Sequence, residues 1–257
     1  MITSTANQQI KNLVQLQKKG KARKDQDVFI AEGLKMYQEA PQDKIVRIYI
    51  SESFLKNPEN SSIKGLKDAE VLEDRIFDYV SDTKTPQGIM CIVRQRHDKI
   101  EDILKEEKPL IMILENLQDP GNLGTIIRTA EGAGVTGIIM SSQTVDIYNP
   151  KTIRSTMGSV YRVPCVRSED IYADIDKIKE AGVRVYAAHL KGKSSYTEED
   201  YSEGTAFLIG NEGNGLSREM AEKADKYILI PMCGRVESLN AAVASTILMF
   251  EARRQRN

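Results

Sequence analysis

The sequence predicts an α/β fold in which a mostly parallel sheet carries helices on both faces, preceded by a smaller α/β segment. The main observation is that short apolar runs alternate with helix-like stretches from Leu110 onward, a pattern typical of parallel sheets. The second is the charged, helix-prone stretch "QRHDKIEDILKEEKP", which ends at Pro109 and separates this part from the region before it. We expect three consecutive parts: a first domain at 1–95, a linker at 96–109 and a second domain at 110–257.

The first segment is expected to alternate short helices and strands. Its predicted helices are Gln8–Lys19, Leu34–Glu39 and Asp74–Val80, and its predicted strands are "VFIAEG", "IVRIYI", "AEVL" and "GIMCIV". The stretch "KNPENSSIKG" is rich in turn-forming residues and is expected to be a loop.

The second segment has a sharper alternation. Its predicted strands are "LIMIL", "GIIM", "VRVYAA", "AFLIG" and "YILIP", and its predicted helices are Gly124–Glu131, Asp170–Ala181, Ser217–Ala224 and Ser238–Arg254. In the last helix Leu239, Val243, Ile247 and Phe250 are spaced as one apolar stripe. Ligands of parallel α/β sheets bind outside the carboxyl ends of the strands, so the loops after these strands are candidate sites.

The composition describes a globular chain of 257 residues, 40% hydrophobic and 28% charged. The N-terminus lacks the apolar core of a signal peptide, and no apolar run approaches membrane-spanning length. Cys91, Cys165 and Cys233 lie far apart and never form a C-x-x-C pair, so we expect a cytoplasmic protein without a zinc site. His97 and His189 have no other plausible ligand nearby, so we expect no metal and ordinary surface or packing roles for both.

Positive charge is concentrated near the N-terminus, although the net charge of the chain is −1. The segment "KKGKARK" holds most of it, and no acidic residue precedes its end. Such a run is often only the solvated end of a helix, but it also suits contact with a polyanion, where each neutralised phosphate adds salt-sensitive affinity. The candidate contact residues are Lys18, Lys19, Lys21, Arg23 and, further along, Arg154.

Two loops that follow predicted strands carry residues with more than one interpretation. In "LENLQDPGNLGTIIRTA", Asn122 is placed to cap the next helix and Arg128 to pair with Glu131 three residues later. In "IPMCGRVESLNAAVAS", Ser238 is a good N-cap. Asn240 has less structural reason to stand in a first helical turn, because Asn is a mediocre helix former.

A third loop, "GNEGNGLS", fits the phosphate-binding pattern G-x-x-x-x-G-K-[ST] except that Leu216 stands where the lysine is required. Without that lysine, and with Glu212 inside the loop, a nucleoside triphosphate would be repelled. The glycines still allow close backbone approach and positive φ, so the loop could seat an adenosine through main-chain groups. A tight surface turn is the alternative.

Together "NLGTIIRTA", "IGNEGNGLS" and "IPMCGRVESLNAAVA" resemble the three signature motifs of the SpoU/TrmH branch of the SPOUT RNA methyltransferases. The resemblance covers about Leu110–Arg254, and "IRSTMGSVYRVP" is similar to the segment between the first two motifs. "TPQGIMCIV" is similar to the join with the N-terminal extension of two-domain members. Members transfer a methyl group from S-adenosylmethionine to a ribose 2′-hydroxyl of RNA, on a trefoil-knotted α/β fold that works as a dimer. The resemblance thus implies a knotted methyltransferase domain that follows a small RNA-binding domain.

The resemblance also implies roles for individual residues. The implied catalytic residues are Arg128, Asn122, Glu212, Ser238 and Asn240, the implied cofactor contacts are Leu208, Gly210, Ile230, Met232 and Leu239, and no metal is implied. Because a guanidinium is almost never deprotonated in proteins, Arg128 is expected to hold an RNA phosphate, with Ser238 and Asn240 orienting it. Glu212 would hold Asn122 or the substrate loop.

Two other protein classes and a second RNA substrate are alternatives to methyl transfer to ribosomal RNA. A nucleotide hydrolase with a variant phosphate loop would need an acidic, metal-binding strand end and a phosphate-directed lysine, and the sequence offers neither. A non-catalytic RNA-binding protein on the same fold would be expected to have lost Arg128 or the cofactor loop, which are both present. Within the enzyme class, a separate N-terminal domain favours ribosomal RNA over tRNA as the substrate.

Overall fold

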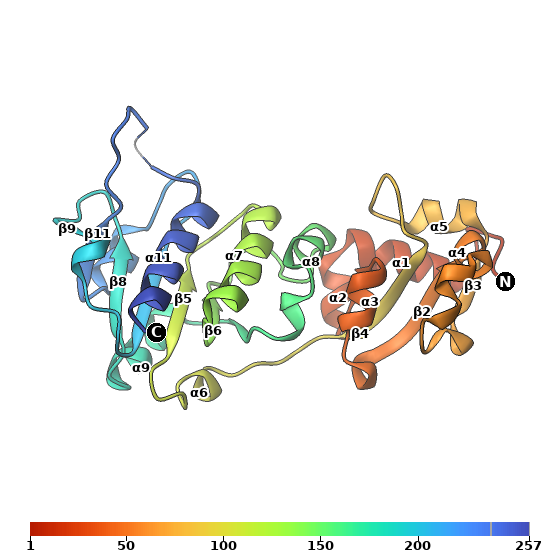
Figure 1. The fold of residues 1–257 in the computed structure, drawn as a ribbon, viewed down its shortest axis with the longest axis horizontal. Helices are drawn as coiled ribbons and strands as arrows, with labels where there is room; N and C mark the ends of the chain where they lie inside the picture. Colours follow the sequence, from red (N-terminus) through yellow and green to blue (C-terminus); the bar gives the residue numbers. More distant parts are fainter. Residues whose placement is uncertain (237, 257) are drawn as a thin grey trace. The chain divides into compact units, whose positions relative to one another are not determined.

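The computed structural model describes residues 1–236 and 238–256. The described chain divides into two compact units (Figure 1): a first unit of Met1–Arg96 with Asp146–Tyr161, and a second unit of His97–Val145 with Arg162–Asn257. The packing therefore groups residues 146–161 with the N-terminal part, although the chain order places them inside the predicted second domain.

The first unit alternates short helices and strands, as expected. Its elements are α1 (Gln8–Lys18), α2 (Gly20–Gln26), β1 (Val28–Glu32), α3 (Leu34–Glu39), β2 (Ile45–Ser51), α4 (Glu52–Lys56), β3 (Glu70–Leu72), α5 (Asp74–Val80), β4 (Ile89–Arg94) and α8 (Pro150–Thr156). Among the described residues its sheet has four strands in the order β1-β4-β2-β3, with only β2 and β3 running parallel. In α1, Ile10, Leu13 and Leu16 share one face and are fully buried against this sheet's core.

The second unit contains the parallel sheet. Its elements are α6 (Ile100–Ile103), β5 (Leu110–Leu114), α7 (Pro120–Ala133), β6 (Gly137–Met140), β7 (Cys165–Arg167), α9 (Ile171–Glu180), β8 (Arg184–Ala188), β9 (Ser194–Ser195), β10 (Thr205–Ile209), α10 (Arg218–Glu222), β11 (Lys226–Leu229) and α11 (Ala241–Gln255). In the part of the chain that the structure describes, seven strands follow the order β7-β6-β5-β10-β8-β11-β9. Each neighbouring pair runs parallel, as the alternation of strands and helices predicted.

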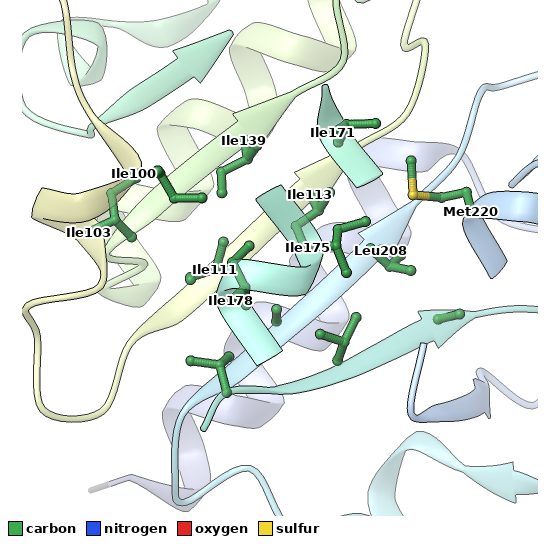
Figure 2. Close-up of a cluster of buried hydrophobic side chains, with 14 residues drawn as sticks. Ile100, Ile103, Ile111, Ile113, Ile139, Ile171, Ile175, Ile178, Leu208 and Met220 are labelled. Carbon is green, nitrogen blue, oxygen red and sulfur yellow. The ribbon is translucent and has the colours of Figure 1, made fainter. Parts of the chain in front are cut away.

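One face of this sheet is covered by α6, α9 and α10, whose isoleucines and Met220 pack onto the strands (Figure 2). The predicted linker is therefore partly core, since Ile100 and Ile103 of α6 are buried there. Ile103 lies so close to β6 that a Cβ on Gly137 would come within 2.3 Å of its Cδ1 atom. This contact requires glycine in the strand.

The opposite face is also covered. Met112 points to that face, because it alternates along β5 with Ile111 and Ile113 of the Figure 2 cluster, and its side chain is fully buried. Helix α11 contacts β10 and packs along α7. Its buried side is made largely of small residues and differs from the predicted stripe, in which Val243 and Phe250 are each 48% exposed. No helix within the described residues is both long enough and apolar enough to cross a membrane.

Candidate active site

The loops that could carry chemistry gather at one edge of the parallel sheet. Strands β5, β10, β8 and β11 are parallel neighbours, so the loops that follow them emerge at the same edge. These loops begin at Glu115, Gly210, His189 and Ile230. The topology thus brings the three motif loops together and adds the loop after β8.

The loop after β10 is closed on itself. Asn211 and Gly215 exchange backbone hydrogen bonds of 3.0 and 2.9 Å, and Gly215 has a φ of +67°. A Cβ on Gly210 would lie 2.1 Å from the carbonyl carbon of Gly215, a distance that real Cβ atoms do not show. Gly210 is therefore needed for close backbone approach and Gly215 for its positive φ.

A cavity of about 350 Å³ is lined by the loops after β8, β10 and β11 and by the start of α11. Four of the five expected cofactor residues line it: Gly210, Ile230, Met232 and Leu239. Leu208, which was expected to contact the cofactor through its main chain, does not line the cavity, and its side chain is fully buried in the core cluster of Figure 2. Leu208 lies inside β10, where alternate side chains face the helices, one residue before the strand end.

The walls of the cavity are mostly apolar side chains and backbone. None of the described lining residues is a lysine or arginine, and Glu212 adds a negative charge. The cavity therefore does not suit a triphosphate, whereas an apolar or cationic ligand held by main-chain groups fits it. Among the described residues no group of His, Cys, Asp or Glu is placed to hold a metal ion.

Glu212 joins the loop after β10 to the loop after β5. Its carboxylate accepts hydrogen bonds of 3.0 Å from the backbone N–H groups of Gln118 and Asp119 and from Nδ2 of Asn122. Burial raises the pKa of this carboxyl, but the hydrogen bonds outweigh it, so the pKa lies below its ordinary value of 4.5. Glu212 therefore acts as an acceptor and holds Asn122, which is one of the two alternatives expected for it, together with the backbone of the loop after β5.

The hydrogen bonds continue from Asn122 to the last helix. Asn240 Nδ2 donates to Asn122 Oδ1 at 2.9 Å, while Asn240 Oδ1 accepts from the backbone N–H groups of Ala242 at 2.9 Å and Val243 at 3.3 Å. Asn240, and not Ser238, is thus the N-cap of α11. The cap also accounts for an asparagine that looked poorly suited to a helix.

Asn122 is likewise not a cap, because Asp119 caps α7 by accepting from the Asn122 N–H at 2.8 Å. This frees the Asn122 side chain for Glu212 and Asn240. The three side chains therefore form a directional chain in which Asn240 donates to Asn122 and Asn122 donates to Glu212. We call Asn240, Asn122 and Glu212 the amide chain.

The other two expected catalytic residues stand apart from the amide chain. Arg128 is exposed on α7 and makes no hydrogen bond or ion pair with any residue that the structure describes. Glu131, its alternative partner in the sequence, instead pairs with Arg162 at 3.1 Å. Ser238 is exposed and lines the cavity. Neither Ser238 nor Asn240 forms a hydrogen bond with Arg128 among the described residues, so the expected orienting role has no contact to support it within one chain.

Three of the four basic residues expected near the N-terminus to contact RNA are exposed to solvent, and the fourth is buried. Lys18, Lys19 and Lys21, which we call the lysine cluster, are exposed and form no ion pair with described residues. The expectation for Arg23 is wrong, since it is only 4% exposed and donates to Asp146 at 2.7 Å and to the Leu16 carbonyl at 2.7 Å. Its place on α2 turns it toward the interior of the unit.

Arg154, on α8 in the first unit, pairs with Asp82 and keeps a third of its side chain exposed. It therefore remains accessible to solvent. His189 was expected to have an ordinary surface or packing role, and the sequence pattern did not indicate that it lines the cavity. Its Nδ1 accepts from the Lys191 N–H at 3.0 Å, and its ring stacks on Tyr227 with centroids 5.1 Å apart. Its position directly after the predicted strand "VRVYAA" was the available signal.

Comparison with known families agrees with this arrangement. The model of the SpoU rRNA Methylase family matches residues 109–250, and that of the MRM3-like substrate binding domain matches residues 7–91. Among curated relatives, RlmP of Bacillus subtilis, a 23S rRNA (guanosine(2553)-2′-O)-methyltransferase, is 34% identical over 253 residues, which are 98% of each chain.

Solved structures agree as well. The AdoMet-bound rRNA methyltransferase of Sinorhizobium meliloti is 37% identical with a TM-score of 0.86, over 98% of this chain and 97% of that one. AviRb of Streptomyces viridochromogenes, in complex with AdoMet, is 25% identical with a TM-score of 0.86, over 97% of this chain and 98% of its own. These neighbours confirm the predicted class, a trefoil-knotted α/β fold behind a smaller domain. Because this one family model matches more than half of the chain, the chain belongs to the SpoU rRNA methylase family.

Proposed function

We propose that this protein transfers a methyl group from S-adenosylmethionine to a ribose 2′-hydroxyl of ribosomal RNA. The observation that carries the proposal is the junction of the cofactor-type cavity with the amide chain, both built from the family's motif loops. The curated relative from Bacillus subtilis performs this reaction on 23S rRNA, and it aligns with 98% of this chain.

The cavity fits S-adenosylmethionine. Its volume of about 350 Å³ is within the usual range for small ligands, about 300–1,000 Å³. Gly210 lets the two ends of its loop approach each other beside the cavity, and Ile230 and Leu239 offer apolar walls for an adenosine. The bound cofactor would supply a methyl group on a positively charged sulfur, with a neutral thioether as the leaving group. A wall that carries Glu212 and no cation suits that charge.

The amide chain supports a positioning role on the substrate side. Because Asn122 and Asn240 each use one amide N–H inside the chain, each keeps a second N–H to donate. Two donors fixed in this way can hold an oxygen of the RNA, and holding the reacting atoms in line can supply about 7–11 kcal/mol of the barrier reduction. Arg128, exposed and without a partner among the described residues, is suited to an RNA phosphate.

The first unit supports the RNA part of the proposal. It matches a substrate binding domain, and its lysine cluster provides charge that phosphates can neutralise. We propose ribosomal RNA in preference to tRNA because a relative that aligns with 98% of this chain is a 23S rRNA methyltransferase. The spacing of the cysteines supports a reducing, cytoplasmic compartment.

We also infer a homodimer. On α11, Val243 and Phe250 are each 48% exposed in an apolar stripe, and such a stripe is usually covered by another surface. Because the stripe is on the chain's own catalytic unit, a second copy is the proposed cover. Light scattering after gel filtration should give twice the mass of 28.8 kDa. A Phe250→Glu variant should elute as a monomer if the stripe is the interface.

The decisive test is calorimetric titration with S-adenosylmethionine, with ATP and magnesium as the parallel control. Micromolar affinity for the methyl donor, about −8 kcal/mol, and none for ATP is the expected result. Incubation with labelled methyl donor and separated RNA fractions should then label ribosomal RNA and leave tRNA unlabelled. If the protein binds neither ligand, a non-catalytic RNA-binding function is favoured. If it binds ATP alone, a nucleotide hydrolase with a variant phosphate loop is favoured.

A further inference from the structure

We propose that Glu115 is a positioning residue for the cofactor pocket and acts through Ser217. Neither residue lines the cavity, and neither belongs to the amide chain. The inference rests on S-adenosylmethionine being the ligand of that cavity. It assigns the affinity for the methyl donor partly to a buried carboxylate that never touches it.

Glu115 is the first residue after β5 and is only 4% exposed. One carboxylate oxygen accepts the Ser217 N–H at 2.7 Å, and the other accepts the Ser217 hydroxyl at 2.6 Å. Glu115 forms no ion pair with any described residue, so these two bonds from Ser217 are its compensation for burial. A carboxylate in such a place needs its acceptors occupied, because a buried charge without partners is costly.

Ser217 transmits this constraint to the wall of the cavity. Its hydroxyl also accepts the Met220 N–H at 3.1 Å and so caps α10. The preceding residue, Leu216, lines the cavity and packs its side chain against the core. A Cβ on Gly210 would lie 2.2 Å from the Leu216 nitrogen, so the two ends of the loop are pressed together. A shift of Ser217 therefore moves the wall where the cofactor lies.

The other attachments of this loop are of a different kind. Asn211 Nδ2 donates to the Asn116 carbonyl at 2.8 Å near the start of the loop, and exposed Glu212 holds its middle. The Glu115–Ser217 pair holds the end of the loop, and it alone of these attachments involves a buried charge. Its loss should leave the loop folded but less fixed, and a less pre-organised wall binds its ligand more weakly.

The experiment compares Ser217→Ala, Ser217→Thr and Glu115→Gln with a matched control, Ser51→Ala. Ser51 caps the five-residue helix α4 in the first unit as Ser217 caps the five-residue α10, with 3.1 Å from its hydroxyl to the Phe54 N–H. Both alanine variants lose one helix cap. Only Ser217→Ala also strips Glu115 of a donor.

We expect Ser217→Ala to raise the Kd and the KM for S-adenosylmethionine about tenfold. The variant leaves one buried carboxylate oxygen of Glu115 without its donor, and a loss of that kind corresponds to about a factor of ten. The kcat and the KM for RNA should change little. Glu115→Gln should raise the same two constants, and Ser217→Thr, which keeps the hydroxyl, should restore them. Ser51→Ala should leave them unchanged while lowering the melting temperature.

The proposal is overturned if Ser217→Ala lowers the melting temperature as Ser51→Ala does but leaves the Kd for the methyl donor at the wild-type value. Ser217 would then be a helix cap only. Failure of the proposed function looks different, since the wild-type protein itself would not bind S-adenosylmethionine.

Discussion

Replacing Glu212 with glutamine tests the amide chain with the smallest change of shape. The carboxylate satisfies three N–H donors with two oxygens, those of Gln118, Asp119 and the Asn122 side chain, each at 3.0 Å. A glutamine has one oxygen and presents N–H groups at the other position. At least one of the three donors must therefore lose its acceptor, and Asn122 loses the charge that fixes which way its amide points.

The size of the effect follows from the burial of the site. A hydrogen bond to a charged group is worth about 1.5–3 kcal/mol when buried, but Glu212 is exposed and solvent screens it. We expect a loss of about 1 kcal/mol in the free energy of unfolding. Methyl transfer should fall further, by about tenfold or more, because a flipped Asn122 would turn an acceptor toward the RNA oxygen instead of a donor.

The assays are single-turnover methyl transfer with saturating S-adenosylmethionine, calorimetric Kd for the cofactor, and urea unfolding as a function of pH. Because the folded-state pKa of Glu212 lies below its ordinary value of 4.5, its stabilisation is present above that value and is lost as the pH falls below it. Glu212→Gln should remove this part of the acid dependence. An unchanged transfer rate together with an unchanged pH profile would refute the amide chain as a positioning device.

Four further predictions concern Gly210, Arg128, the lysine cluster and Arg23. Gly210→Ala should abolish cofactor binding, because its Cβ would meet Gly215 at 2.1 Å, whereas Gly213→Ala, whose nearest contact would be 3.5 Å away, should bind normally by calorimetry. Arg128→Ala should abolish transfer but keep the cofactor Kd; loss of both in a folded protein would contradict its role. Neutralising the lysine cluster should weaken RNA binding and lower the slope of log K against log salt, and an equal slope would remove it from the interface. Arg23→Ala should instead lower the melting temperature, because its charge is held inside the first unit by a 2.7 Å ion pair.

Nine of the eleven described strands could be predicted from the sequence, but not the short β7 and β9, and α7 begins at Pro120 instead of the predicted Gly124. The apolar runs and the helical spacing reflect burial against the sheet of their own unit, and α3 and α5 begin and end at the predicted residues. The predicted stripe of α11 failed because that helix buries small residues, which carry little hydrophobic signal. The burial of α6 within the predicted linker could not be foreseen. The stretch "HDKIEDILKEEK" is mostly charged, and its two isoleucines, Ile100 and Ile103, pack into the core.

The residue types of the site could be predicted, but not their connections. The N-cap rule favoured Ser238 and Asn122, yet the structure caps α11 with Asn240 and α7 with Asp119. The caps themselves are local, but the side-chain bonds of the amide chain join residues 90 and 118 positions apart. Local propensity carries no information on such pairs. Arg23 failed for the same reason, because its partner Asp146 is 123 positions along the chain.

His189 shows what strand order adds to strand prediction. The strand "VRVYAA" was expected, but the order of strands along the sheet cannot be deduced from periodicity. Once β8 is known to lie between β10 and β11, the loop after it must emerge between the loops that begin at Gly210 and Ile230. Since those two loops form the cavity, the loop between them has to form part of its wall. His189 is therefore a lining residue by topology, whatever its side chain.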